Sequence, residues 1–573
     1  MRHLFAALKK HRLECVLAPL FKMLEAFFDL QVPIFVARLI DEGIGGASRE
    51  TIWRYCFLLI GMAALGLICS FTAQYFAARA ASASAVRLRR DLYRKVLEMN
   101  YQRLDESGVS TLITRLTSDV NLVQNGVNMF LRLFLRSPFI VFGSVIMAFT
   151  VSAKAALVFL VCVPVLAVII ALIMKRTSPL YRTVQEKLDG VTRLTRENLS
   201  GVRVVRAFRR EQDEEKAFAS SNEALYNASM HAARISARMN PLTYVVVNLG
   251  IAAILIIASR LIDGGSMLSG DVVALINYMG QILVELVKLA NLVVLLSRAY
   301  AGVRRISDVL DADTRIPIQE ITEAEDAETA IAFDRVSLRY QGAGEDSLTD
   351  ISFTVKAGET VGVIGGTGSG KTSLVNLIPR LYDATEGAVR VFGRDVKSLD
   401  SALLRRTIAV VPQKSQLFLG TVRSNLTMGR ENAPDDLLWQ ALEDAQAADF
   451  VRAKDGGLDA AVEQGGRKFS GGQKQRLTIA RALATGAPIL ILDDASSALD
   501  MATDARLRAA LKRMTDVTKV IVSQRTASLT GCDRILVLDD GRLAACGTHE
   551  ELLEISPIYR EIHESQHRKG EEM

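Results

Sequence analysis

Six long apolar stretches, separated by polar segments, occupy the first 300 residues of the chain. A helix needs about 20 residues to cross a hydrocarbon core of roughly 30 Å, and each stretch is about that long. The pattern therefore predicts an all-α transmembrane domain over residues 1–310. Its six expected helices lie near residues 16–40, 55–81, 129–150, 155–174, 242–262 and 272–296.

The polar segments between these stretches alternate in length and charge. Residues 86–128 and 175–240 are long and basic, whereas the other connecting segments are short and carry few basic residues. The positive-inside rule places the long segments and both chain ends in the cytoplasm. Apolar residues recur there at helical spacing, so we expect these segments to extend the membrane helices. Their tips, near 101–108 and 209–218, are the expected contacts with a soluble domain.

The pattern changes after residue 310. Residues 311–330 are acidic and irregular, which is typical of a linker. From residue 331 to 565, short strand-like runs alternate with helical patterns and glycine turns, as in an α/β domain. Residues 566–573 form a charged tail. The expected fold is therefore a multi-domain membrane protein with an all-α half followed by an α/β half.

A glycine-rich loop in the α/β half fits the phosphate-loop pattern G-x-x-x-x-G-K-[ST]. A strand-like run precedes the loop and a helical pattern follows it, which is the context that the motif requires. Its glycines allow backbone N–H groups to point at a phosphate, and the helix N-terminus favours the same anion. We expect the lysine to reach the β- and γ-phosphates and the threonine hydroxyl to bind Mg²⁺. The expected nucleotide-binding residues are Gly365, Gly366, Thr367, Gly368, Ser369, Gly370, Lys371, Thr372 and Ser373.

Two further segments carry candidate chemistry. Asp493 and Asp494 follow the apolar run 489–492, at the end of a strand where open α/β sheets bind ligands, so Asp493 is the expected Mg²⁺ partner of the loop threonine. A second anion site is predicted at a helix start, where serine and glycines again precede a helical pattern. One nucleotide does not need two such sites, so the second is expected to serve a nucleotide held by another chain. Its residues are Ser470, Gly471, Gly472 and Gln473.

Composition and charge agree with a membrane half joined to a soluble half. Half of the residues are hydrophobic, 23% are charged and the formal net charge is +6. Juxtamembrane lysine and arginine account for this mild charge, so no nucleic-acid partner is implied. The six cysteines show no spacing typical of a metal site or a disulfide framework. No cleavable signal peptide is expected at the N-terminus.

The ordered motifs resemble those of the ATP-binding domain of ABC transporters, and the likeness extends over nearly the whole chain. The glycine-rich loop matches Walker A, residues 489–493 match Walker B and residues 470–473 match the signature motif. Gln413 matches the Q-loop, Asp500 the D-loop, and Tyr340 the aromatic residue that stacks on adenine. Six membrane helices before one such domain resemble the exporter-type half-transporters.

This resemblance implies ATP and Mg²⁺ as cofactors, with Thr372, Gln413 and Asp493 as the metal-binding residues. It also implies two nucleotide-binding domains stacked head to tail, each ATP lying between one chain's Walker A and the other's signature. ATP-driven closure would move the membrane helices and expose a central cavity to the opposite side. The expected location is a bacterial plasma membrane, with the nucleotide-binding domain in the cytoplasm.

Two positions depart from the family's pattern. Asp494 stands where the family usually has a glutamate that orients the attacking water, and Gln524 replaces the switch histidine. Aspartate is shorter by one C–C bond, about 1.5 Å, and a catalytic group misplaced by about 1 Å can lose on the order of a hundredfold in rate. An amide cannot become cationic. These changes predict the ATP-retaining half of a heterodimeric multidrug-type exporter; a homodimer with slow hydrolysis is the alternative.

Charged residues inside two apolar stretches give a hypothesis about the substrate. Glu25 and Asp29 share one helix face with Lys22, and Glu285 lies near Lys288. Charges at membrane depth face a cavity or pair internally. The faces could line a pathway for amphipathic or cationic compounds, or the charges could neutralise each other. A lipid or glycolipid flippase and an ATP-gated channel or regulatory subunit remain alternative functions.

Overall fold

The computed structural model describes residues 1–46, 48–312, 326 and 328–571. The described chain divides into two compact units, which we treat separately. One contains residues 1–97 and the described residues from 109 to 312, and the other contains 98–108 and the described residues from 326 onward. The short helix α4 (Tyr101–Ser107) thus belongs to the second unit.

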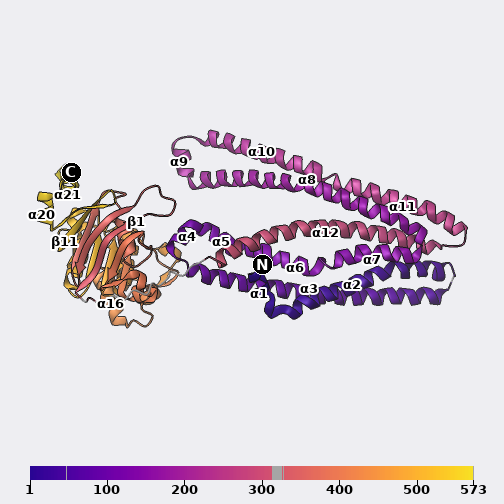
Figure 1. Cartoon of the computed structure of the whole chain (residues 1–573), viewed down its shortest axis with the longest axis horizontal. Helices are drawn as coiled ribbons and strands as arrows, with labels where there is room; N and C mark the ends of the chain where they lie inside the picture. Colours follow the sequence, from indigo (N-terminus) through magenta and orange to yellow (C-terminus); the bar gives the residue numbers. More distant parts are fainter. Residues whose placement is uncertain (47, 313–325, 327, 572–573) are drawn as a thin grey trace. The chain divides into compact units, whose positions relative to one another are not determined.

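The first unit is helical, as the apolar pattern predicts, and α8 and α10 lie side by side in it (Figure 1). Both long segments predicted to extend the membrane helices are helical over most of their length. The α-helices are α1 (Arg2–Leu8), α2 (Arg12–Arg38), α3 (Arg49–Leu97), α5 (Val109–Thr114), α6 (Val120–Leu133), α7 (Arg136–Val151), α8 (Ala153–Ser200), α9 (Val202–Ala207), α10 (Glu211–Ser236), α11 (Met239–Asp263) and α12 (Ser269–Leu310).

Five helical stretches among the described residues are long and apolar enough to cross a membrane. The predicted span at 16–40 forms α2, but Lys22, Glu25 and Asp29 make this helix too charged to belong to that set. A sixth span over α2 therefore stays a prediction. The five stretches are Arg49–Leu97, Val109–Val151, Ala153–Ser200, Glu211–Asp263 and Ser269–Leu310.

Small side chains allow the helices of this unit to approach closely. Ala73, Ala77 and Ala80 of α3 are fully buried, and α3 packs along α2. Alanine and glycine at such faces bring backbones together, which favours van der Waals packing between membrane helices. Gly270 shows the limit, since a Cβ atom there would lie 2.2 Å from the carbonyl oxygen of Ala37.

Three sheets form the framework of the second unit. The largest has the order β12-β11-β3-β10-β9-β6, with β12 antiparallel and the other strands parallel, and an antiparallel sheet has the order β2-β1-β4-β5. The strands are β1 (Thr329–Leu338), β2 (Leu348–Lys356), β3 (Thr360–Gly365), β4 (Glu386–Val391), β5 (Arg394–Asp395), β6 (Ile408–Val411), β7 (Gly420–Thr421), β8 (Ala461–Val462), β9 (Ile489–Asp493), β10 (Thr518–Val522), β11 (Arg534–Asp539) and β12 (Arg542–Gly547).

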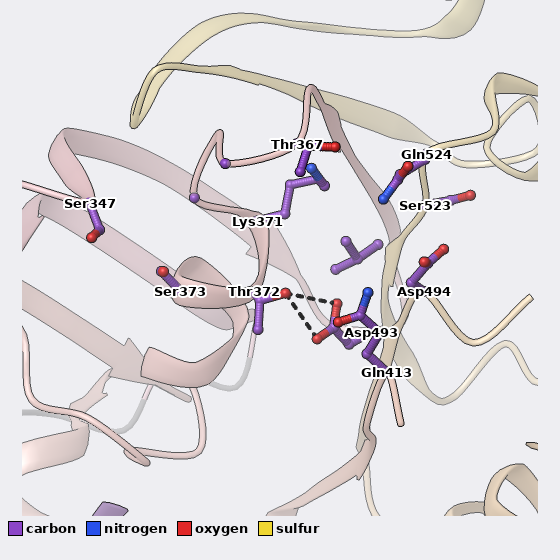
Figure 2. A pocket seen from close by; sticks show the side chains of 13 residues that line it. Ser347, Thr367, Lys371, Thr372, Ser373, Gln413, Asp493, Asp494, Ser523 and Gln524 are labelled. Atoms are coloured by element: carbon purple, nitrogen blue, oxygen red, sulfur yellow. Dashed lines mark hydrogen bonds between the residues drawn. The ribbon is translucent and has the colours of Figure 1, made fainter. Parts of the chain in front are cut away.

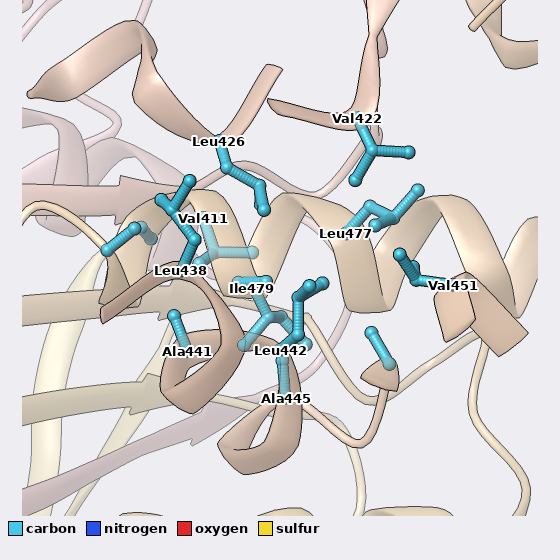
Figure 3. Packing of buried hydrophobic residues seen from close by; sticks show 14 of the residues in the cluster. Val411, Val422, Leu426, Leu438, Ala441, Leu442, Ala445, Val451, Leu477 and Ile479 are labelled. Atoms are coloured by element: carbon cyan, nitrogen blue, oxygen red, sulfur yellow. The ribbon is translucent and has the colours of Figure 1, made fainter. Parts of the chain in front are cut away.

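Strand β9 shows how the parallel sheet is buried on both faces. Ile489 and Ile491 pack with β1, β2 and β4, whereas Leu490 and Leu492 pack on the opposite face against a helical layer. Successive strand residues point to opposite faces, so a continuous apolar run fits a strand covered on both sides. Figure 3 shows the core of this helical layer around Leu477 and Ile479.

Helices cover the sheets and connect their strands. Their bounds confirm the α/β character that the sequence predicts for this half. They are α13 (Lys371–Leu377), α14 (Ser401–Thr407), α15 (Val422–Leu426), α16 (Asp435–Asp444), α17 (Ala448–Arg452), α18 (Gly471–Leu483), α19 (Met501–Arg513), α20 (His549–Ile555) and α21 (Pro557–Glu571).

The predicted domain limits differ slightly from the bounds of the elements. Strand β1 begins at Thr329, just before the expected start at residue 331. Most of the expected linker, 313–325 and 327, lies outside the described residues. The expected charged tail, 566–573, begins inside α21, which continues to Glu571. The C-terminal helix is therefore longer than the sequence pattern suggested.

Candidate nucleotide-binding site

Four loops with candidate chemistry meet at one edge of the largest sheet. Strands β3, β10, β9 and β6 are neighbours and run parallel, so their carboxyl ends share this edge. The glycine-rich loop follows β3, Gln524 follows β10, Asp494 follows β9 and Gln413 follows β6. The strand order thus gathers residues that lie more than 100 positions apart in the sequence. Ligands bind at this edge in open α/β sheets.

A cavity of about 280 Å³ lies between these loops. Figure 2 shows Lys371 and Thr372 on one side of it and Asp493, Asp494 and Gln524 on the other. The described residues that line it are Ser347, Thr367, Gly368, Gly370, Lys371, Thr372, Ser373, Gln413, Asp493, Asp494, Val522, Ser523 and Gln524. The sequence-predicted Walker A, Walker B, Q-loop and switch residues therefore surround one space.

The glycines of the loop have the backbone geometry that the motif requires. Gly368 and Gly370 have φ angles of 88° and 92°, in the left-handed region that favours glycine. A Cβ atom on Gly370 would lie 2.7 Å from the carbonyl oxygen of Ser347. Gly370 also precedes α13, so the loop leads directly into a helix N-terminus. This is the arrangement that binds a phosphate through backbone N–H groups.

The amino group of Lys371 lies inside the loop. Its Nζ donates to the carbonyl oxygens of Gly366 at 2.6 Å and Gly365 at 3.0 Å. Burial lowers the pKa of Lys371, and the nearby Asp494 and Asp493 carboxylates oppose that shift. The amine is therefore a half-buried cation next to the cavity, where an anionic phosphate would stabilise it.

Thr372 and Asp493 form the expected Mg²⁺ position. The Thr372 hydroxyl donates to Asp493 Oδ2 at 3.2 Å (Figure 2). Asp493 is only 6% exposed. Burial raises the pKa of Asp493. No cluster of three or more His, Cys, Asp or Glu side chains suited to a metal occurs among the described residues. One carboxylate and one hydroxyl still fit Mg²⁺, which takes few protein ligands and completes its shell with phosphate oxygens and water.

Asp494 and Gln524 occupy the cavity wall facing Lys371. Burial raises the pKa of Asp494, while a hydrogen bond from Gln413 acts in the opposite direction. Asp494 has a φ angle of 48°, a left-handed conformation that aspartate adopts more readily than most residues. Its backbone N–H donates to the carbonyl oxygen of Val522 at 3.0 Å, which ties it to the strand before Gln524. The two departures from the family pattern are therefore neighbours in space.

Tyr340, the predicted adenine-stacking residue, lies beside the loop rather than in the cavity wall. Its hydroxyl donates to Ser373 Oγ at 3.0 Å, and its ring meets Tyr382 edge-on at 5.1 Å between centroids. The Tyr382 hydroxyl donates to Asp105 Oδ2 of α4 at 2.5 Å. The predicted tip near residues 101–108 thus contacts the nucleotide-binding domain through the neighbour of Tyr340.

The predicted signature residues begin α18. The backbone N–H of Gln473 donates to Ser470 Oγ at 3.3 Å, and that of Ser470 donates to Gln473 Oε1 at 3.0 Å. This reciprocal pair is a capping box, which fixes the helix start. Among the described residues lining the phosphate cavity, none belongs to this segment. Asp500, the predicted D-loop residue, similarly caps α19 by accepting from the N–H of Thr503 at 2.9 Å.

The charged residues proposed for the substrate pathway form ion pairs in the first unit, and a 3.9 Å contact between Arg136 and Glu25 joins the two hydrogen-bonded groups. Arg136 donates to Asp29 Oδ2 at 2.9 Å and to Glu285 Oε1 at 2.6 Å. Lys22 pairs with Glu25 at 2.5 Å, and Lys288 Nζ donates to Glu285 Oε1 at 2.9 Å. These pairs favour the alternative of internal neutralisation. A pathway lined by Glu25, Asp29, Glu285 and Lys288 stays a prediction.

Sequence reasoning missed three residues near the site. Ser347 lines the cavity from the start of β2, Tyr382 links Tyr340 to α4, and Gln566 of α21 bonds to the Gln524 segment. None of the three belongs to a motif or to a spacing that is typical of a functional site. Their roles depend on contacts between distant parts of the chain, so only the fold reveals them.

Comparisons with known proteins agree with this geometry. Residues 15–286 match the ABC transporter transmembrane region, and residues 348–497 match the ABC transporter domain. The uncharacterized ABC transporter ATP-binding protein YfiB of Bacillus subtilis is 34% identical over 575 residues, covering 100% of both chains. The multidrug efflux ATP-binding/permease protein Rv0194 of Mycobacterium tuberculosis is 31% identical over 93% of this chain and 44% of its own length.

A solved structure shares the fold. The structure of a bacterial Atm1-family ABC exporter with ATP bound has a TM-score of 0.80 at 22% sequence identity, and the match covers 97% of this chain and 98% of the other. The chain therefore shares the fold of that exporter. Because the likeness to YfiB spans the full length and both family matches occur in order, this chain belongs to the ABC transporter family, with a transmembrane domain followed by a nucleotide-binding domain.

Proposed function

We propose that this chain is one half of a heterodimeric ATP-driven exporter of amphipathic or cationic compounds. In this proposal its own Walker site holds ATP and hydrolyses it slowly, while its signature segment completes a faster site on the partner. One observation carries the proposal. Asp494 and Gln524, the two positions that depart from the family pattern, line the same cavity as an intact set of ATP-binding residues.

The residues that hold ATP have complete chemistry. Lys371 and the N–H groups of the glycine-rich loop bind the phosphates, and Thr372 with Asp493 binds Mg²⁺. When bound there, Mg²⁺ would offset the negative charge of the phosphates. The buried carboxylate of Asp493, whose pKa is raised, gains a cation as its partner. Binding is therefore expected to be tight even where hydrolysis is slow.

The residues that should promote hydrolysis are weakened in two ways. The carboxylate of Asp494 is set back by about 1.5 Å relative to a glutamate. Gln524 can donate a hydrogen bond to a phosphate oxygen, but it supplies neither a positive charge nor a proton. Catalysis of phosphoryl transfer depends on positioning and on charge stabilisation, so both changes act on the rate rather than on binding.

The signature segment supports the role assigned to the partner's site. Its capping box is formed, Gly471 has open space around its Cα atom, and Ser470 is exposed. A phosphate held by a second chain could therefore approach the N-terminus of α18, where the helix dipole favours an anion. Because this segment does not line the chain's own cavity, we assign it to the other ATP of the dimer.

The name of one relative supports multidrug-type export. Rv0194 is named a multidrug efflux protein, and this chain matches 44% of its length. ATP would favour a closed pair of nucleotide-binding domains, and loss of the γ-phosphate would restore the open state. Export by this cycle requires the bilayer and a second half-transporter as partners.

Substitutions at residue 494 test the division of labour between the two sites. In the assembled pair, Asp494→Asn should lower ATPase activity far less than the Glu→Gln change at the corresponding position of the partner. Asp494→Glu should raise hydrolysis at this chain's site by about tenfold, since it restores the reach of the carboxylate. Steady-state ATPase assays and single-turnover assays on this chain measure the two effects. An equal collapse of activity from both neutral substitutions would refute the proposal.

Transport assays test the substrate class and direction. Inside-out vesicles containing the pair should accumulate a cationic dye only when ATP is supplied. A Lys371→Ala variant of this chain is the matched control for nucleotide dependence. Movement of a labelled lipid between leaflets, without dye accumulation, would indicate a lipid flippase instead of an exporter. ATP-dependent ion conductance without either activity would indicate a channel.

A further inference from the structure

The C-terminal helix α21 contacts the switch segment through Gln566 and His563, and His563 Nδ1 lies 3.1 Å from the Thr526 hydroxyl. Gln566 Nε2 donates to the carbonyl oxygen of Gln524 at 2.7 Å. Gln566 Oε1 accepts from the backbone N–H of Thr526 at 3.0 Å and from its hydroxyl at 3.1 Å. The single amide therefore binds a backbone acceptor and a backbone donor on either side of Arg525. Thr526 is fully buried, so the acceptor satisfies a group that water does not reach.

Helix α21 is itself fixed against the strand that leads into the phosphate loop. Tyr559 is fully buried in a cluster with Leu529, which follows the switch segment, and Ile364, which immediately precedes Gly365. His549 Nδ1 lies 2.7 Å from the Tyr559 hydroxyl and links α20 to the same helix. The helix is therefore placed by the core beneath the loop rather than by a loose surface contact.

The chemistry at position 566 is specific to an amide. An amide group presents a donor and an acceptor in one plane, as a neighbouring peptide group does in a strand pair. A carboxylate keeps the acceptor for Thr526 but cannot donate to the Gln524 carbonyl, and an aliphatic side chain does neither. The rest of the switch segment is held from the strand side, where Ser523 N–H donates to the carbonyl oxygen of Val363 at 3.1 Å. On the opposite side, His563 and Gln566 both contact Thr526, whereas Gln566 donates to the Gln524 carbonyl.

We propose that Gln566 is a positioning residue that holds Gln524 at the phosphate end of the nucleotide cavity. Gln524 lines that cavity, and its carbonyl oxygen is fixed by the Gln566 amide, so the direction of its side chain depends on α21. This inference rests on the proposed function, in which Gln524 contacts the terminal phosphate of a retained ATP. The C-terminal helix is then part of the site rather than a tail attached to it.

The test measures how long ATP stays on this chain in the assembled transporter. The complex is loaded with radiolabelled 8-azido-ATP, chased with unlabelled ATP, cross-linked by light at intervals, and the label on this chain is counted after separation. Gln566→Leu should shorten retention by about five- to tenfold, the effect of losing one or two neutral hydrogen bonds. Gln566→Glu should have a smaller effect. Glu561→Gln, on an exposed part of the same helix, should leave retention unchanged.

A double-mutant cycle separates positioning from general destabilisation. Gln566→Leu should have no further effect on ATP retention in a Gln524→Ala background, because alanine at position 524 has no amide group to be positioned in the cavity. An equal fractional loss in both backgrounds would overturn the proposal, as would unchanged retention in the single variant. If Gln566→Leu reduces the yield of folded protein, the same double-mutant cycle is carried out with Gln566→Glu. Rapid hydrolysis of ATP on this chain in the unmodified complex would contradict the proposed function. It would leave the positioning role of Gln566 to be judged from the cycle, which compares variants with each other.

Discussion

Asp493 and Lys371 are the residues whose charges the bound nucleotide is expected to stabilise. Asp493 is almost completely buried next to Asp494, and burial raises the pKa of both carboxyl groups. Burial lowers the pKa of Lys371 on the opposite wall. Without a ligand the site thus holds half-buried charges of both signs in poor solvation. A bound phosphate would place negative charge next to the lysine, and Mg²⁺ would place positive charge next to the carboxylates.

Replacing Asp493 with asparagine should stabilise the nucleotide-free protein and abolish its response to MgATP. The folded state raises the pKa of this carboxyl, so keeping it ionised opposes folding at pH above that pKa, and the penalty disappears as the pH falls through it. Asparagine cannot ionise and therefore removes the penalty. Thermal unfolding with and without MgATP measures both effects, and Glu554→Gln, at an exposed position, is the control.

The opposite pattern would contradict this account of residue 493. If Asp493→Asn lowers the unfolding temperature of the nucleotide-free protein, the carboxylate contributes to stability through its bond with Thr372 instead. If the variant keeps its full stabilisation by MgATP, residue 493 does not hold the metal. Without nucleotide, the unmodified protein should also gain stability relative to Asp493→Asn as the pH falls below the raised pKa. The comparison with the variant cancels the contribution of other titrating groups.

At the scale of elements, α4 is a short helix with its own start and stop signals. Asn100 accepts from the N–H of Arg103 at 2.9 Å, which caps the N-terminus, and Gly108 ends the helix with a φ angle of 71°. The helix contacts the nucleotide-binding domain through Asp105, which accepts from Tyr382. Burial, together with the Asp105 carboxylate, raises the pKa of Tyr382, so its phenol stays protonated and able to donate.

Tyr382→Phe should weaken coupling between ATP hydrolysis and transport while leaving ATP affinity unchanged. The variant keeps the ring that meets Tyr340 but loses the hydrogen bond to α4. We expect about a fivefold lower ratio of substrate moved to ATP hydrolysed, corresponding to roughly 1 kcal/mol for one hydrogen bond. Parallel transport and ATPase assays measure this ratio, and Asp105→Asn should behave similarly. A changed ATP affinity in Tyr382→Phe would instead place the residue in nucleotide binding.

The membrane half contains an ion network that joins three helices. Arg136 of α7 bonds to Asp29 of α2 and Glu285 of α12, and Ser137 donates to the second oxygen of Glu285 at 2.7 Å. Glu285 is 3% exposed, so its charge depends on these partners. Removing one partner of a buried ion pair leaves the other charge uncompensated, which typically costs about 3–5 kcal/mol.

Arg136→Met should therefore destabilise the transmembrane domain, and a second substitution should restore much of the loss. Methionine leaves Glu285 without its main partner, whereas the pair Arg136→Met with Glu285→Gln removes both charges. The yield and thermal stability of detergent-solubilised protein measure both variants. Stability that is unchanged in Arg136→Met would show that Lys288 and Ser137 alone satisfy Glu285. A double variant worse than either single variant would exclude mutual neutralisation as the reason for the network.

The sequence signals of the candidate nucleotide site are local. Strand β3, the glycine-rich loop and α13 follow each other directly, and the acidic residues stand at the end of β9. The structure confirms the membrane and α/β halves that the hydrophobic pattern predicts. Contacts made only by folding escape prediction: Arg136 lies between two helices distant in sequence, and Gln566 lies in what looks like a polar tail. For Lys22, Glu25 and Asp29 the sequence suggests either a pathway or mutual pairing, and only the fold shows that Asp29 bonds to Arg136.

At the scale of the whole molecule, the account requires two unequal ATP sites shared between two chains. The chain's own cavity contains Walker A, Walker B, the Q-loop and the switch position, but none of its described lining residues comes from its signature segment. In the proposed dimer, α18 of each chain would complete the ATP site of the other chain. Ser470→Arg should nearly abolish turnover of the pair, because a bulky cation would occupy the partner's phosphate position. ATP binding at Lys371 of this chain should persist in that variant.

The fate of ATP on each chain of the assembled transporter tests the central claim most directly. The complex is supplied with ATP labelled on the γ-phosphate or on the base, and the nucleotide bound to each chain is identified during steady turnover. The account predicts unhydrolysed ATP on this chain for many cycles, while the partner's site releases ADP and phosphate. A symmetric pair of this chain alone, with rapid hydrolysis at its own glycine-rich loop, would contradict it.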